Sequence, residues 1–291
     1  MSAGRTAFVL AGGGSLGAVQ VGMLQALLAA GEQPDFLVGS SVGALNACYL
    51  AAYPNLTGVE QLVKIWTGLR RSDIFPLSLA TAFAVMSRRD YVVDPEPLRR
   101  LVSGALPFSR LEEAPLPVHL VATDMQGVAA LLSRGPAVDA IMASAAVPGV
   151  FPAVEIDGAA LMDGAVAANT PLGAAATLGA RRIVILPTGY ACDLLAPPAG
   201  AVARALHAIT LLIAWQLIRD IERLSPEVEL RLVPALCPLD VSPYDFTRAA
   251  SLIERARGST EKWIAEGGLE TPASPVQLAP HHHHHAHQTG H

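Results

Sequence analysis

Apolar and polar positions along the chain form short and long segments in alternation, and this pattern predicts strands followed by helices. Short apolar runs rich in β-branched residues predict strands, and longer runs with apolar positions three to four residues apart predict helices. The predicted strands are 6–11, 35–40, 117–124, 128–133, 182–188 and 228–236, and the predicted helices are 15–31, 42–53 and 58–70. This alternation predicts an α/β fold with a mostly parallel central sheet flanked by helices.

Two other apolar segments raise the question of membrane contact. Residues 205–218, ALHAITLLIAWQLI, are too few to cross a bilayer, so we expect a buried helix there. Residues 74–86 carry no charge and precede Arg88 and Arg89. This second segment is compatible with a helix of the core, or with a surface that touches lipid and gives peripheral membrane contact.

The chain has 291 residues, and no internal repeat or long flexible linker divides it. We therefore predict one domain over residues 1–275. Residues 276–291 include seven of the nine histidines and predict a disordered tail or a purification tag. Such a histidine cluster binds metal ions unspecifically and is not expected to form a defined site.

The charge and the cysteines narrow the classes of protein further. The net charge is -5, and no basic cluster with interleaved aromatic residues occurs, so a nucleic-acid partner is not expected. Cys48, Cys192 and Cys237 lie far apart without a Cys-x-x-Cys spacing, which indicates free thiols in a reducing compartment. We interpret the apolar N-terminal run as the first strand instead of a signal peptide, and therefore expect a cytoplasmic protein. No particular oligomeric state is predicted.

A glycine loop follows the first predicted strand. Residues 12–17 read GGGSLG and match the G-x-G-x-x-G pattern of dinucleotide-binding proteins. In those proteins an acidic residue at the end of the second strand binds the ribose. Asp35 has roughly the right separation here, but it begins the second predicted strand. A nucleotide site is therefore the weaker interpretation of the loop.

The second predicted strand ends in a candidate nucleophile. Residues 39–43 read GSSVG, a G-x-S-x-G motif between a predicted strand and a predicted helix. In this setting Ser41 occupies a strained turn, while Gly39 and Gly43 leave room for neighbouring backbone. The amides that begin the next helix favour negative charge beside it. We therefore predict Ser41 as the nucleophile of a hydrolase.

A serine nucleophile needs a base. Outside the tail the histidines are His119, inside a predicted strand, and His207, inside a predicted helix, and both positions are typical of packed histidines. A triad that uses His207 or a tail histidine is therefore the less favoured alternative. Among the carboxylates, Asp157-Gly158 predicts a hairpin turn, whereas Asp163 follows the second arm of that hairpin and is the better candidate for the base.

The order of these motifs resembles that of the patatin-like phospholipases. The chain carries G-G-G-x-x-G at 12–17, G-x-S-x-G at 39–43 and D-G-A at 163–165, and segments 121–127 and 143–154 are similar to the family's connecting segments. The resemblance implies a three-layer patatin-like fold. It also implies a lipid acyl hydrolase that cleaves fatty-acyl esters through a Ser-Asp dyad, with no catalytic histidine, no metal and no cofactor.

The resemblance further assigns roles to individual glycines. It implies that the amides of Gly13 and Gly14, with help from Gly12, form the oxyanion hole, and it gives supporting roles to Gly17, Gly39, Gly43 and Gly164. Many members carry Arg or Lys just before the last glycine of the loop, whereas this chain has Leu16. The resemblance therefore implies an acyl-ester substrate without a defined head group. A catalytically silent protein that binds a lipid or a partner on the same fold is the alternative.

Overall fold

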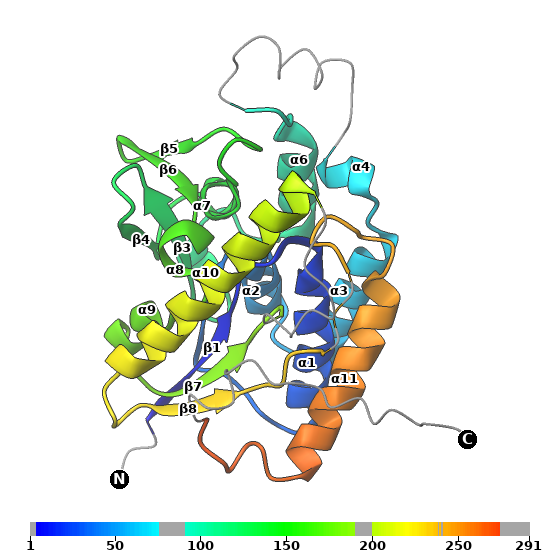
Figure 1. Cartoon of the computed structure of the whole chain (residues 1–291). Coiled ribbons are helices and arrows are strands. Elements are labelled where there is room, and N and C mark those ends of the chain that lie inside the picture. Colours follow the sequence, from blue (N-terminus) through cyan, green and yellow to red (C-terminus); the bar gives the residue numbers. More distant parts are fainter. Residues whose placement is uncertain (1–3, 76–90, 190–199, 238, 240, 274–291) are drawn as a thin grey trace, which may run out of the picture.

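The computed structural model describes residues 4–75, 91–189, 200–237, 239 and 241–273, and its centre is one eight-stranded sheet (Figure 1). The strands are β1 (Arg5–Leu10), β2 (Phe36–Ser40), β3 (Val118–Asp124), β4 (Ala129–Leu132), β5 (Val154–Ile156), β6 (Ala159–Asp163), β7 (Ala180–Leu186) and β8 (Glu229–Leu232). The helices are η1 (Gly14–Leu16), α1 (Gly17–Ala29), α2 (Val42–Ala52), α3 (Leu56–Gly68), α4 (Arg71–Ile74), α6 (Glu96–Ala105), η2 (Leu111–Glu113), α7 (Ala137–Ser144), α8 (Ala165–Ala168), α9 (Leu172–Thr177), α10 (Ala201–Arg223) and α11 (Ala249–Ala265).

The sheet is mostly parallel, as the sequence predicts. Its order is β5-β6-β3-β2-β1-β7-β8, with β4 paired to β3. Strands β3, β2, β1, β7 and β8 pair in parallel, and β4, β5 and β6 add antiparallel pairs at one side. Parallel neighbours require crossover helices, which is why helical segments separate these strands along the chain.

Helices cover both faces of the sheet, so the fold has three layers. Phe8 and Leu10 of β1 belong to a large apolar cluster shared with α1, α2, α3 and α11. Ala7 and Val9 alternate with them and belong to a second cluster, which includes Leu217 of α10 and residues of α9. Because successive side chains of a strand point to opposite faces, these two clusters lie on opposite sides of the sheet.

The helix predicted at 205–218 lies within α10, but the expectation that it is buried is wrong. Leu217 is the one buried side chain among those described in α10, whereas Ile209, Leu212 and Trp215 are exposed. The helix packs on the sheet along one side and crosses the front of the molecule in Figure 1. No helix in the described part of the chain is long and apolar enough to cross a membrane.

The cysteines only partly follow the prediction. Cys48 is a buried free thiol in α2. Cys237 is disulfide-bonded, so the expectation of three free cysteines is wrong at this position. Spacing along the chain does not reveal such a bond, because it says nothing about distance in the fold.

Several predictions concern residues that the structure does not describe. They are most of the apolar segment 74–86, the arginines that follow it, and the histidine-rich tail 276–291. The domain assignment to residues 1–275 also stays a prediction.

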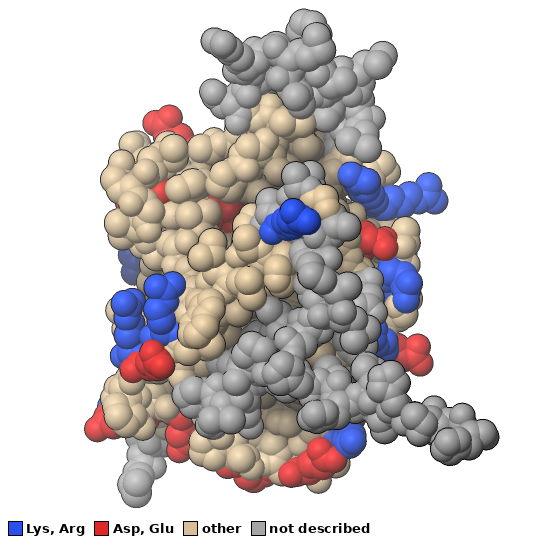
Figure 2. Space-filling model, in the orientation of Figure 1, with Lys and Arg blue, Asp and Glu red and all other residues tan. Residues whose placement is uncertain are grey.

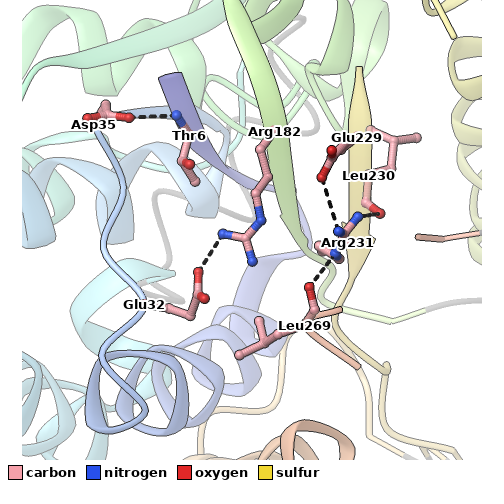
Figure 3. A network of polar contacts seen from close by, with 8 residues as sticks. All are labelled: Thr6, Glu32, Asp35, Arg182, Glu229, Leu230, Arg231 and Leu269. Atoms are coloured by element: carbon pink, nitrogen blue, oxygen red, sulfur yellow. Dashed lines mark hydrogen bonds and ion pairs between the residues drawn. The ribbon is translucent and has the colours of Figure 1, made fainter. Parts of the chain in front are cut away.

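Ion pairs and hydrogen bonds stabilise the end of the sheet at which its parallel strands begin (Figure 3). Arg182 of β7 forms an ion pair with Glu32, which follows α1, and both side chains are about four-fifths buried. Asp35 accepts a hydrogen bond from the Thr6 backbone amide at 2.6 Å. The carboxylate considered for ribose binding therefore fixes backbone at the sheet end opposite to the carboxyl ends of these strands.

Candidate active site

Strands β2 and β6 lie end to end along one edge of β3. Ser40 of β2 pairs with Val121, and Asp163 of β6 pairs with Ala122, the next residue of β3. Strand β4 occupies the other edge of β3 at these positions, so β6 must share its edge with β2. The end of β2 therefore meets the end of β6, and Ser41 and Asp163 emerge at the same point.

Ser41 occupies a sharp turn between β2 and α2. Its φ is 53° and its ψ is -124°, a strained conformation for a residue with a side chain. The turn is crowded, since a Cβ on Gly39 would stand 2.5 Å from the carbonyl oxygen of Gly43, and one on Gly43 would stand 2.2 Å from that of Leu10. Both motif glycines are thus needed for close approach of backbone.

Ser144, the last residue of α7, anchors this turn from the side. Its Oγ accepts a hydrogen bond from the Ser41 amide at 3.0 Å and donates one to the Val121 carbonyl at 2.6 Å. The hydroxyl therefore connects the turn to β3. No sequence motif indicated this role for Ser144, although the residue lies within the family-like segment 143–154.

The side chains of Ser41 and Asp163 form a direct hydrogen bond. The Ser41 hydroxyl donates to Asp163 Oδ2 at 2.7 Å, and the Ala165 amide donates to Asp163 Oδ1 at 2.8 Å. Asp163 is only 3% exposed, and this burial raises its pKa to about 6, against the opposing effect of the two hydrogen bonds. The carboxylate is thus a proton acceptor whose pKa lies near neutrality.

The glycine loop lies against the Ser41 turn, since a Cβ on Gly12 would stand 3.1 Å from the Cβ of Ser41. The Gly12 amide donates to the Asn169 carbonyl at 3.0 Å, so Gly12 is not a free donor. Gly13 and Gly14 stand at the start of η1, where amides have no partner within the helix, and neither donates a hydrogen bond to any residue in the described ranges. Thr188 holds the loop by donating from Oγ1 to the Gly12 carbonyl at 2.6 Å.

Two other motif glycines lie close to these elements. Gly17 begins α1, and a Cβ there would stand 2.5 Å from Val42. Gly164 follows β6, and a Cβ there would stand 2.1 Å from the Val121 carbonyl oxygen.

Neither histidine considered for a triad joins the pair. His119 is level with Val38 of β2, three residues before Ser41 and therefore about 10 Å away along the strand. Its Nδ1 is bonded to Ser133 Oγ, and burial followed by the charge of Arg5 lowers its pKa. His207 lies on α10 and makes no hydrogen bond to Ser41 or Asp163 in the described structure.

An apolar cavity of about 120 Å³ begins at Ser41 and extends between α2, α3, α4 and α6. Aliphatic and aromatic side chains dominate its wall, including Leu45, Trp66, Phe75, Leu98, Phe151 and Phe246. Phe75 stacks on Phe151 and contacts Phe246, so the aromatic rings form one connected wall. Sequence patterns could not reveal this cavity, because its wall combines segments far apart in the chain.

The motif order and this geometry agree with a comparison across protein families. The model of the patatin-like phospholipase family matches residues 8–176, which is more than half of the chain. The chain belongs to the patatin-like phospholipase family. The matched residues include the glycine loop, the Ser41 turn and Asp163.

Individual members of the family are moderately similar. An uncharacterized NTE family protein of Mycobacterium tuberculosis is 32% identical over 172 residues, which are 59% of this chain and 45% of that protein. Patatin-like phospholipase domain-containing protein 6 of Homo sapiens is 27% identical over 186 residues, or 63% of this chain and 13% of that protein. The chain thus spans less than half the length of either relative. Human GIVD cytosolic phospholipase A2, solved with methyl gamma-linolenyl fluorophosphonate, has a TM-score of 0.44 and 12% identity over 94% of this chain and 59% of that one.

Proposed function

We propose that the chain is a lipid acyl hydrolase that cleaves fatty-acyl ester bonds with Ser41 as the nucleophile and Asp163 as the base. The 2.7 Å hydrogen bond from the Ser41 hydroxyl to Asp163 Oδ2 carries the proposal. It places a proton acceptor on a serine that a strained turn presents in the wall of an apolar cavity. Membership of the patatin-like phospholipase family supports this class of reaction.

In the first half of the reaction, Ser41 Oγ attacks the ester carbonyl carbon while its proton passes to Asp163. A carbon–oxygen bond forms to Oγ, and the carbonyl oxygen becomes an oxyanion. When this intermediate collapses, the bond to the alcohol oxygen breaks. The proton on Asp163 passes to the departing alcohol, which leaves an acyl group on Ser41.

In the second half, a water molecule replaces the alcohol. Asp163 takes a proton from the water as its oxygen attacks the acyl carbon. The bond to Ser41 Oγ then breaks, and the proton returns from Asp163 to Oγ. The fatty acid leaves, and the enzyme regains its starting protonation.

The amides of Gly13 and Gly14 are the proposed donors to the oxyanion. They begin a helical turn, and among the described residues neither donates a hydrogen bond, so both can donate to a negative charge. Because the Gly12 amide is bonded to Asn169, we assign Gly12 the task of holding the loop in place. This narrows the role that the resemblance alone implies for Gly12.

The apolar cavity favours a fatty-acyl chain on the carbonyl side of the ester. A hydrocarbon chain gains free energy when it leaves water for such a lining, whereas a charged or sugar-like group loses its hydration there. The proposed substrates are therefore esters of fatty acids, including phospholipids and lysophospholipids.

A fluorophosphonate probe tests the nucleophile directly. We expect the probe to label the wild type and the Asp157→Asn variant, whose substitution lies in a hairpin turn outside the site. We expect Ser41→Ala to take no label and Asp163→Asn to label much more slowly. Labelling that persists in Ser41→Ala would contradict the assignment. Fatty-acid binding without labelling or hydrolysis of nitrophenyl esters would favour the catalytically silent alternative.

A further inference from the structure

The outer face of α10 is apolar. This face consists of Ala208, Leu211, Leu212 and Trp215, whose spacing of three, four and seven residues from the first places them on one side of the helix. All four are exposed, Leu212 to 66% and Trp215 to 61%. Leu217, which packs on the sheet, points to the opposite side. The helix thus carries apolar side chains toward the core and also toward solvent.

Basic residues frame this outer face at both ends. Arg204 lies four residues before Ala208, and Arg219 lies four residues after Trp215, so both continue the same side of the helix. Figure 2 shows a mostly uncharged surface where α10 crosses the front of the molecule, with basic side chains near its two ends. The acidic residues of the helix, Asp220 and Glu222, lie beyond Arg219.

Gln216 of α10 is hydrogen-bonded to the segment that follows Asp163. Gln216 Oε1 accepts a hydrogen bond from the Asn169 amide at 2.8 Å, and its Nε2 donates one to the Ala167 carbonyl at 2.7 Å. This segment, α8, begins two residues after Asp163, and its Val166 is 47% exposed. The outer face of α10 therefore lies on a helix bonded directly to the active-site segment.

A second copy of the chain fits this face poorly. Two copies of α10 paired antiparallel about a twofold axis between Leu211 and Leu212 would place Arg204 of one copy opposite Arg219 of the other. Such pairing brings like charges together at both ends of the apolar contact. The apolar face of α10 with an arginine at each end is instead complementary to a surface that has anionic groups around an apolar interior.

We propose that the outer face of α10 docks the protein on a lipid surface that carries anionic phosphate head groups. The leucines would enter the acyl region, Trp215 would lie at head-group level, and the two arginines would meet phosphates. The proposal rests on the proposed function, because a fatty-acyl ester substrate resides in a lipid aggregate. Docking through α10 brings that aggregate to a helix bonded to the active-site segment.

Vesicle binding tests the docking surface. The Ser41→Ala chain, which should leave the lipid intact, is sedimented with vesicles of phosphatidylcholine alone or mixed with phosphatidylglycerol. We expect stronger binding to the anionic vesicles. Tryptophan emission should shift to the blue on binding, and Trp215→Ala should remove this shift. Adding Leu212→Glu should lower the partition coefficient about ten-fold. The matched control is Leu56→Glu on α3, which puts the same charge at another exposed leucine and should bind unchanged.

The outcomes separate this proposal from the proposed function. With Ser41 restored, we expect Leu212→Glu to hydrolyse a monomeric butyrate ester like the wild type and vesicle lipid about ten-fold more slowly. Equal vesicle binding by Leu212→Glu and its parent would overturn the docking proposal, whatever the ester activity. A dimer in light scattering that Leu212→Glu dissociates would also overturn it, in favour of a second copy. Vesicle binding that depends on Leu212 without hydrolysis of either substrate would support docking and refute the proposed function.

Discussion

Ser41 and Asp163 are separated by 122 positions in the sequence, and yet the Ser41 hydroxyl donates to Asp163 Oδ2 at 2.7 Å. The reason is the shared edge of β3, along which β2 ends just where β6 ends from the other direction. Neither side chain needs a long reach. The backbone of the sheet holds both, so the geometry of the proposed dyad depends on strand register.

Replacing Asp163 with Asn should separate activity from stability. Asn keeps an oxygen that accepts the Ser41 hydroxyl but cannot take its proton, so we expect kcat for nitrophenyl esters to fall by about 10²–10⁴-fold. The free energy of unfolding at pH 7 should rise, because the variant no longer buries a charge. A pKa shift from 3.8 to about 6 corresponds to about 3 kcal/mol, and this gain is reduced by the cost of placing the Asn NH2 group opposite the Ala165 amide, which donates to Oδ1 in the wild type. Urea unfolding measures it, with Asp157→Asn as the control.

The same shift predicts how the stability of the wild type depends on pH. The unfolded chain releases the Asp163 proton near pH 3.8, whereas the folded chain holds it until about pH 6. Between these values the folded state binds more protons, so the contribution of Asp163 to the free energy of unfolding rises as the pH falls. The stability of Asp163→Asn relative to the wild type should therefore fall by about 3 kcal/mol as the pH is lowered from 7 to below about 4. A difference that is the same at every pH would contradict this assignment of the raised pKa.

Activity should follow the ionisation of Asp163. A protonated carboxyl cannot accept the Ser41 proton, so we expect kcat/KM to be constant above the pKa and to fall about ten-fold per pH unit below about pH 6. Initial rates with a monomeric ester, measured from about pH 4.5 to about pH 8, give this profile. The ester itself is stable over roughly this pH range. Asp157→Asn should give the same profile. A midpoint near pH 4 would contradict the raised pKa of Asp163.

Ser144 should matter for the orientation of Ser41. Ser144→Ala leaves the Ser41 amide and the Val121 carbonyl without this buried partner, and we expect a loss of about 1–3 kcal/mol in the free energy of unfolding. Because the strained turn loses its anchor, kcat should also fall, with KM much less affected. Ser103→Ala is the control, since among the described residues that exposed hydroxyl bonds only to a carbonyl of its own helix, α6. Unchanged kcat in Ser144→Ala would show that the turn keeps its geometry without this anchor.

The apolar cavity should set the preference for acyl-chain length. Val102 of α6 lines it, and Val102→Phe adds volume inside an already packed wall. We expect kcat/KM to fall about ten-fold for a dodecanoyl ester and to change little for a butanoyl ester, because only the longer chain needs the filled space. Leu56→Phe at the surface is the control. An equal loss for both esters would mean that the cavity does not hold the acyl chain.

Much of the fold and of the candidate site could be predicted from local patterns. The apolar periodicities predicted strands close to β1, β2, β3, β4, β7 and β8, because period and length are properties of short segments. The Asp157-Gly158 turn was predicted for the same reason, and both residues have the positive φ that a two-residue hairpin requires. Ser41 was predicted from a local motif whose glycines make room for its turn, and Asp163 from its place after the second arm of the predicted hairpin.

Other features were decided only by tertiary structure. Strand pairing puts Asp163 beside Ser41, and the packing of loops and helices brings the Asn169 carbonyl to the Gly12 amide and Ser144 of α7 to the Ser41 turn. No local pattern encodes which of these segments meet. The apolar sequence of α10 predicted burial, but a helix that is apolar on several sides does not reveal which side will meet the core. The sequence therefore determined the elements and their chemistry, while the packing of the sheet determined which groups meet and which apolar face stays in contact with solvent.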